Sequence, residues 1–179
     1  PELRQNGAVL VDCGFITTSV NAIFGEGVTD LKSFSLGGGY ITGDLMEVLK
    51  IPFDSAEQLK RKIILTWAAT EDDYYETIVE NQIVRFKATL VNEIALARID
   101  EIVVAVKKCI DLFENKLSDD VVVYVTGGGL NYFKGIDQYI EQSLNRKVKL
   151  IAPHPLQYKK PDLSSSIALI DSAINMEIH

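Results

Sequence analysis

The sequence predicts an α/β domain, and three features carry that prediction. Val121 to Val125 is rich in valine and typical of a buried strand, and it runs through Thr126 into three consecutive glycines. Short apolar runs separated by turn residues between residues 8 and 36 predict an antiparallel meander. Between residues 86 and 117 the apolar positions step by threes and fours, which predicts a long amphipathic helix.

The meander is expected to contain three strands, at Ala8–Cys13, Ser19–Gly25 and Leu31–Leu36. Its first turn places Asp12 at the end of a strand, followed by Gly14 and two threonines. A carboxylate, a glycine and hydroxyl groups together suit a hydrated Mg²⁺ beside phosphate oxygens, because this cation prefers oxygen ligands and keeps its waters. An ordinary β-turn with local hydrogen bonds explains the same residues equally well.

The remaining elements follow from periodicity and from turn residues. Helices are expected at Tyr40–Leu49, 54–64, Phe133–Leu144 and Ser164–Ile174, and strands around 76–84 and at Lys147–Ile151. Asp54 and Glu57 have the spacing of a capping box at the start of the second of these helices. No internal repeat is expected.

Glu57 and Lys60 lie three residues apart, so they share one face of the predicted helix. From that face they could hold ribose hydroxyls and the rim of a purine. The alternative is that Glu57 belongs to the capping box and that Lys60 is a solvated charge.

Gly127, Gly128 and Gly129 present bare backbone at the carboxyl end of a strand, where α/β sheets bind ligands. A phosphate or a ribose could approach closely there. The same glycines can also serve as a helix-entry turn, for which Asn131 is a suitable N-cap.

The long helix from residue 86 to residue 117 could extend for about 45 Å if it is unbroken. Such a helix, or two helices meeting near Ala97, would bridge two lobes. Arg98 interrupts its apolar stretch. This side chain either lies along the surface or sits in a groove that receives a partner peptide.

Composition and charge argue against several classes of function. The chain has 179 residues, of which 47% are hydrophobic, so it can bury a substantial core as one domain or two small lobes. A net charge of −7 without a basic stripe argues against nucleic-acid binding. Cys13 and Cys109 lie far apart, which is typical of reduced thiols in a cytosolic protein, and only two histidines argue against a zinc site. No apolar run approaches a membrane span.

The order of the motifs resembles the second half of the actin-like ATPases, and within them most closely the cell-division protein FtsA. The motifs are Val11-Asp12-Cys13-Gly14 with Thr17-Thr18, Leu36-Gly37-Gly38 with Ile41-Thr42-Gly43-Asp44-Leu45, Ala56-Glu57-Gln58-Leu59-Lys60, Asn92-Glu93-Ile94 with Arg98-Ile99-Asp100-Glu101-Ile102, Val125-Thr126-Gly127-Gly128-Gly129 with Gly135-Ile136, and Pro153 with Ser164-Ser165-Ser166.

This resemblance implies a ribonuclease H-like core, a mixed sheet flanked by helices, with a smaller inserted α+β subdomain. The core, subdomain IIA, is expected to comprise residues 1–36 and 98–179, and the inserted subdomain IIB residues 37–97. The first lobe of the family, its small inserted domain and its membrane-binding C-terminal helix are expected to lie outside this chain.

The resemblance also implies roles at a site for ATP and Mg²⁺. Asp12, Gly14, Thr17 and Thr18 would form the second phosphate loop, with Asp12 facing the water shell of the metal as the catalytic carboxylate. Gly38 would pass near the phosphates or the ribose.

By the same resemblance, Glu57 and Lys60 would line the adenosine pocket, and Gly127–Gly129 with Asn131 would close its other wall. Arg98 would lie in the groove that receives the tail of the tubulin-like partner FtsZ. The intact protein is then expected to form actin-like filaments at the division site, on the cytoplasmic side of the membrane.

Three departures from the family pattern bear on nucleotide binding. Phe15 and Ile16 stand where the family usually has glycines, and Ser19 stands where an Asp is common. A β-branched side chain resists positive φ and crowds an approaching phosphate. Tight ATP binding is therefore in question, and this chain by itself is expected not to hydrolyse ATP.

Three other readings stay open beside an FtsA-like scaffold. The first is a PilM-like or reactivase-type adaptor of the same fold. The second is a phosphotransferase or polyphosphatase of that fold, whose acid or base would lie in the other lobe. The third is a degenerate interaction module that binds no nucleotide, which Phe15 and Ile16 favour.

Overall fold

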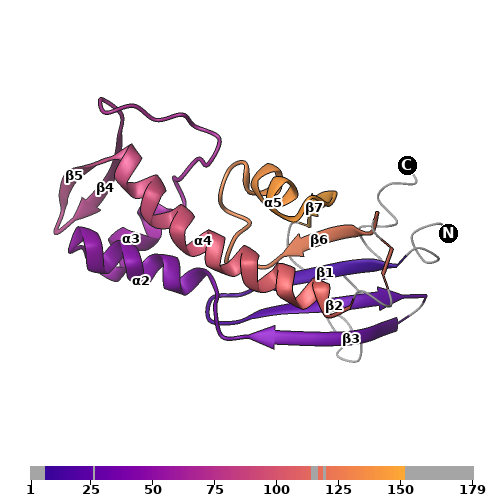
Figure 1. Cartoon of the computed structure of the whole chain (residues 1–179). Helices are drawn as coiled ribbons and strands as arrows, with labels where there is room; N and C mark the ends of the chain where they lie inside the picture. Colours follow the sequence, from indigo (N-terminus) through magenta and orange to yellow (C-terminus); the bar gives the residue numbers. More distant parts are fainter. Residues whose placement is uncertain (1–6, 26, 114–116, 119, 152–179) are drawn as a thin grey trace, which may run out of the picture.

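The computed structural model describes residues 7–25, 27–113, 117–118 and 120–151. It shows a five-stranded mixed sheet at one end and a smaller group of helices with a two-stranded sheet at the other (Figure 1). The large sheet has the strand order β3-β2-β1-β6-β7 and the small one pairs β4 with β5. The α/β fold class predicted from the sequence is confirmed.

The meander that opens the chain forms one half of the large sheet. Strands β1 (Ala8–Cys13), β2 (Thr18–Phe24) and β3 (Gly27–Phe34) pair antiparallel in sequence order. Strand β3 is longer than predicted because pairing with β2 resumes directly after the turn, with Phe24 opposite Gly27.

The other half of the sheet is parallel. Strand β6 (Val122–Thr126) lies beside β1, and β7 (Val148–Leu150) lies beside β6 in the same direction. Asp12 is therefore paired with Thr126 at the carboxyl ends of two neighbouring strands. Because parallel strands end at the same edge, the turns that follow β1 and β6 are brought together, although they are far apart in the sequence.

The smaller group contains α2 (Gly38–Leu49), α3 (Phe53–Lys60), β4 (Tyr74–Val79) and β5 (Gln82–Lys87). Helix α4 (Ala88–Asp111) then runs from this group back along the large sheet (Figure 1). Its 24 residues correspond to about 36 Å. The helix is unbroken at Ala97, so one continuous helix rather than two connects the groups.

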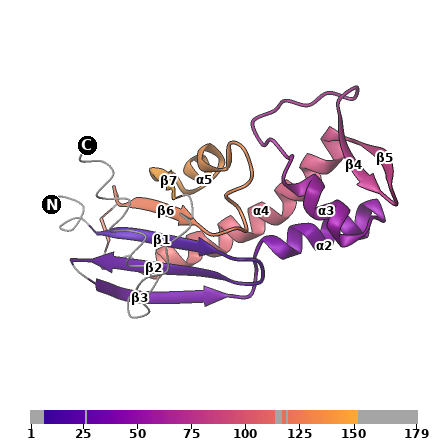
Figure 2. The same ribbon diagram turned by 180° about the vertical axis from the view of Figure 1, so that it is seen from behind.

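The main core lies between α4 and one face of the sheet. Val9 and Val11 alternate with residues of the other face, and they belong to the same buried cluster as Ile102 and Val106 of α4. Figure 2 shows α4 passing behind the strands from the opposite viewpoint. A smaller cluster of Ala8, Leu10, Tyr124 and Ile151 lies on the other face.

Several predicted boundaries were wrong for local reasons. Helix α4 begins at Ala88, not Phe86, because Phe86 and Lys87 pair with β4. The predicted short strands near residues 76–84 form a full hairpin with Glu80 and Asn81 at positive φ in its turn. The predicted helix at Ser164–Ile174 lies outside the described residues.

The predicted capping box is also wrong. Helix α3 begins after Pro52, which occupies the N-cap position without a side-chain hydrogen bond, and α3 ends at Lys60 rather than Ile64. Pro52 fixes the entry geometry that a capping side chain would otherwise provide. Glu57 is therefore free of a capping role.

Candidate functional site

Three glycine-containing turns meet at the carboxyl edge of the large sheet. We call them the first glycine turn (residues 14–17), the second (37–39) and the third (127–129). The Gly129 amide donates to the Cys13 carbonyl at 2.8 Å, and the Gly38 amide donates to the Gly14 carbonyl at 2.9 Å. The first and third turns thus lie side by side, as their assignment to a single ATP site by resemblance requires.

Close packing of these turns explains most of their glycines. A Cβ on Gly129 would lie 2.4 Å from the Gly14 carbonyl oxygen, and one on Gly38 would lie 2.5 Å from Cα of Gly129. Gly127 has a φ of +93°, and a Cβ there would lie 2.5 Å from the Asp12 carboxylate. Gly128 differs, since it is exposed and a Cβ would meet only the Tyr132 ring at 3.7 Å. Gly128 is therefore the bare backbone of this turn that a ligand can approach.

The polar side chains in and beside the first glycine turn differ in exposure. Asp12 is half-buried and Thr17 is exposed, so both can meet a ligand. Thr18 is fully buried, and its hydroxyl donates to the Leu36 carbonyl at 2.7 Å. The Gly14 amide donates to the Thr17 carbonyl at 2.9 Å, which closes the turn.

Glu57 and Lys60 do not project into solvent but join α3 to the start of α2. The Lys60 ammonium donates to the Gly38 carbonyl at 3.1 Å, to the Thr42 hydroxyl at 2.8 Å and to Oε1 of Glu57 at 2.5 Å. The Thr42 hydroxyl also makes a hydrogen bond to Oε1 of Glu57. Lys60 is 2% exposed, so the alternative of a solvated lysine is wrong.

The protonation of Glu57 reflects this network. Partial burial raises the pKa of the Glu57 carboxyl, but the hydrogen bonds from Lys60 and Thr42 and the positive charge of Lys60 outweigh burial. The pKa therefore lies below its usual value of 4.5, and Glu57 is a carboxylate at neutral pH.

Two aromatic residues at the site were missed as contacts. The Phe15 ring lies over Lys60, with the ammonium 5.5 Å from the ring centroid, and the Tyr132 ring lies 5.0 Å from the Arg61 guanidinium. These pairs link the first and third glycine turns to α3. An aromatic residue in or beside a glycine turn indicates that a ring lies near the site. Which residue that ring contacts depends on where α3 is placed.

Asn131, predicted to line the pocket or to cap the following helix, bonds to backbone beyond the third glycine turn. The Asn131 amide donates to the Ile151 carbonyl at 2.9 Å, beyond β7, and it does not cap a helix. Helix α5 (Ile136–Leu144) starts later than predicted, after Gly135 with a φ of 86°. Asn131 therefore fixes the third glycine turn to the edge of the sheet.

Arg98 lies on α4 and faces α2. Its Nε donates to Asp44 Oδ2 at 2.7 Å and its Nη2 to Asp44 Oδ1 at 2.9 Å, while Nη1 pairs with Glu101 at 2.6 Å. The bidentate pair ties α4 to α2, and the Tyr40 ring lies 5.7 Å from the guanidinium. Arg98 is thus part of a helix–helix contact rather than a free surface charge.

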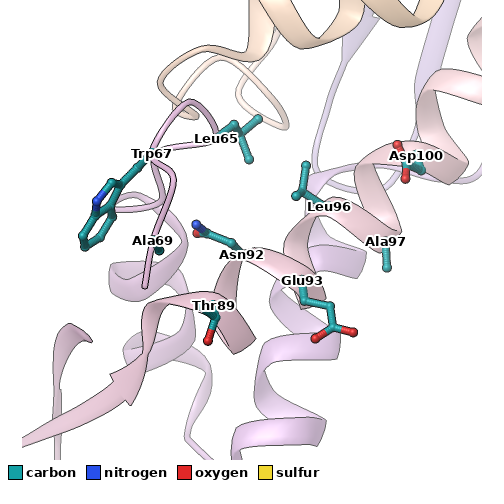
Figure 3. A pocket seen from close by; sticks show the side chains of 9 residues that line it. All are labelled: Leu65, Trp67, Ala69, Thr89, Asn92, Glu93, Leu96, Ala97 and Asp100. Carbon is teal, nitrogen blue, oxygen red and sulfur yellow. The ribbon is translucent and has the colours of Figure 1, made fainter. Parts of the chain in front are cut away.

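A separate cavity of about 530 Å³ opens beside α4 (Figure 3). Its lining residues come from α4 and from the segment between α3 and β4: Leu65, Trp67, Ala69, Thr89, Asn92, Glu93, Leu96, Ala97 and Asp100. Leu65 and Leu96 face each other across it (Figure 3). None of the residues predicted to contact a nucleotide lines this cavity.

In the part of the chain that the structure describes, no group of three or more His, Cys, Asp or Glu residues is arranged to hold a metal ion by itself. No described helix is long and apolar enough to cross a lipid bilayer.

A family model described as cell division protein FtsA matches residues 9–168 of the chain. The chain belongs to the FtsA family. It is 26% identical over 180 residues to FtsA of Staphylococcus epidermidis (strain RP62A), a match that covers 97% of this chain and 38% of that protein. With FtsA of Streptococcus pneumoniae it shares 28% identity over 173 residues, covering 95% and 37%. The chain thus spans less than two fifths of the length of these FtsA relatives.

Solved structures show that this FtsA-family chain has an actin-like fold. The PilM–PilN type IV pilus biogenesis complex matches with a TM-score of 0.63 and 16% identity, covering 84% of this chain and 37% of that one. A non-polymerising MamK mutant bound to AMPPNP matches with the same TM-score of 0.63 and 16% identity, and with coverage of 84% and 50%. An archaeal actin homologue matches with a TM-score of 0.58 and 17% identity, covering 96% and 49%. At these identities the likeness concerns the fold alone.

Proposed function

We propose that the intact FtsA-family protein binds ATP with Mg²⁺ and that this chain supplies one wall of the site. The observation that carries the proposal is the meeting of three glycine turns beside Asp12 at the carboxyl edge of the sheet. MamK, which shares the fold, has been solved with AMPPNP bound. We also propose that residues 1–36 and 98–179 act as subdomain IIA and residues 37–97 as subdomain IIB.

The residues of the edge suit a magnesium–phosphate group. Mg²⁺ is usually held by one or two carboxylates together with phosphate oxygens and several waters, so a single carboxylate at Asp12 is sufficient for a water-mediated contact. The exposed Thr17 hydroxyl and the open backbone at Gly128 can donate to phosphate oxygens. When bound, Mg²⁺ would neutralise charge on the phosphates.

Titration of the intact protein with ATP and Mg²⁺ tests this proposal. We expect saturable binding that Asp12→Asn weakens by about 10- to 100-fold, as is typical when an outer-shell partner of a metal is lost. Asp54→Asn, an exposed carboxylate in the first turn of α3, is the control and should bind as the unmodified protein does. Absence of saturable binding by the intact protein would refute the nucleotide site.

We further propose that the intact protein assembles into actin-like filaments at the division site and docks the tail of an FtsZ-type partner against the α2–α4 face. Arg98 retains partial exposure there, with 24% of its side chain accessible, and lies beside the exposed Tyr40 and Glu101. An arginine beside an aromatic ring is typical of residues that dominate protein interfaces.

A pull-down with an FtsZ tail peptide tests the docking proposal. Arg98→Ala should reduce capture by about tenfold or more, a loss typical of an interface arginine. Arg85→Ala, on the exposed β4–β5 hairpin, should leave capture unchanged. Equal capture by both variants would show that the α2–α4 face is not the docking surface.

A further inference from the structure

The Glu57–Lys60 pair has no donor left to offer a ligand. An ammonium group has three N–H donors, and the three acceptors of Lys60 are the Gly38 carbonyl, the Thr42 hydroxyl and Oε1 of Glu57. Lys60 therefore positions Glu57 and does not itself contact a ligand in this arrangement. Among the described residues, no hydrogen bond occupies the second carboxylate oxygen, Oε2 of Glu57, which can accept from a hydroxyl.

The Phe15 ring packs beside Lys60, the cationic member of this pair. Its ring lies so closely over Gly39 that a Cβ on that glycine would be 2.6 Å from a ring carbon. The ring is also 5.5 Å from the Lys60 ammonium and meets the Phe53 ring edge-on, with 6.0 Å between centroids. Phe15 is 49% exposed whereas Lys60 is 2% exposed, so a half-exposed ring lies beside a buried ammonium.

The Phe15 main chain is held by a hydrogen bond, whereas its side chain is half-exposed. The Phe15 carbonyl accepts a hydrogen bond from the Gly39 amide at 2.7 Å, which anchors the first glycine turn to the second. Besides packing on Gly39, the ring makes one cation–π contact and one edge-to-face contact, each of which is weak at a half-exposed position. Rotation about the side-chain bonds would move the ring away from Gly39 and Lys60 without moving the main chain of the turn.

We propose that Phe15 is an aromatic gate over the Glu57–Lys60 pair, whose ring must leave Gly39 before the ribose of a purine nucleotide reaches Oε2 of Glu57. This inference rests on the proposed nucleotide site and specifies what limits entry to it. The ribose diol is the matching chemistry, because a carboxylate oxygen accepts hydrogen bonds and cannot donate them. The apparent association constant then equals the intrinsic one multiplied by the fraction of molecules in which the gate is open.

Calorimetric titration of the intact protein with three probes tests the gate: ADP with Mg²⁺, adenosine, and pyrophosphate with Mg²⁺. Phe15→Ala should tighten binding of ADP and adenosine by about 5- to 30-fold, the range that the two ring contacts allow. Binding of pyrophosphate, which has no ribose, should not change. Phe53→Ala removes the edge-on partner without altering the turn and should give a smaller gain in the same direction.

Phe24→Ala is the matched control, because Phe24 is also 49% exposed but lies at the far end of β2. It should leave all three affinities unchanged, and a cooperative thermal melt of each variant shows that the variant is folded.

Binding of ADP by Phe15→Ala but not by the unmodified protein would support the gate. Equal ADP affinities of the two proteins would overturn the gate and leave the nucleotide site intact. An equal gain for pyrophosphate would also overturn it, since Phe15 would then only crowd the phosphates. If Phe15→Ala binds none of the probes, both the gate and the nucleotide site fail.

Discussion

Glu57 illustrates how one residue acquires its properties from two helices, α2 and α3. Spacing predicts that it shares a helical face with Lys60, and the structure confirms this. Its other partner, Thr42, comes from α2 and cannot be inferred from spacing within α3. Burial of the Lys60 ammonium is unfavourable unless its donors are satisfied, and the Gly38 carbonyl completes that set.

The pH dependence of stability should report on Glu57. Because its pKa is lower in the folded protein than the usual 4.5, the pair stabilises the fold above about pH 4.5 and this contribution is lost as the pH falls through the folded value. Glu57→Gln removes the carboxylate, so the variant should melt below the unmodified protein at pH 7, and the difference should shrink as the pH falls below 4.5 and through the folded value. Thermal melts across this range of pH measure the effect.

Gln58→Ala is the control for this series, since Gln58 is exposed on the same helix and does not titrate. A difference in melting temperature between Glu57→Gln and the unmodified protein that stays constant down to the acidic end of the series would show that the ionised carboxylate does not stabilise the fold.

At the scale of elements, the glycine turns are packed parts rather than flexible loops. Gly38 opens α2 and contacts the third glycine turn directly, whereas a Cβ added to Gly43, further along the same helix, would meet nothing within 4 Å. Gly38 and Gly43, two of the three glycines of α2, therefore make a natural comparison. Backbone blocks the first position, and nothing blocks the second.

Gly38→Ala should destabilise the protein by about 2 to 3 kcal/mol, because the added methyl group meets backbone that cannot yield without separating the turns. Gly43→Ala should instead stabilise it by about 0.5 to 1 kcal/mol, the usual preference for alanine inside a helix. Urea unfolding followed by circular dichroism measures both. Equal effects of the two substitutions would mean that the turns are not in close contact.

The existence and type of elements with strong periodicity were predicted well. The residues at which several of them begin or end were not. Strand β1 occupies the predicted residues, because its apolar run is bounded by Gly7 and Gly14. The first residues predicted for helix α4 belong instead to strand β5, because Phe86 fits both a helical and a strand pattern. Helix α3 starts after a proline that fixes its entry, which outweighed the capping-box spacing.

At the scale of the whole molecule, the parallel pairing of β1 and β6 brings the site together. The first and third glycine turns are separated by more than half of the chain, and the order of motifs allowed their adjacency to be predicted. The position of Phe15 over Lys60 could not be predicted, because it depends on how α3 is placed against the first glycine turn by α2 and α4. The sequence shows that Phe15 departs from the family pattern, but it does not show what the ring contacts.

The most direct test of the account is hydrogen exchange of the intact protein, followed by mass spectrometry, with and without ATP and Mg²⁺. If the three glycine turns form a nucleotide wall, peptides that cover residues 12–18, 37–42 and 126–132 should exchange more slowly when the ligand is bound. Protection confined to the cavity between residues 65–69 and helix α4, or no protection in any peptide, would contradict the account.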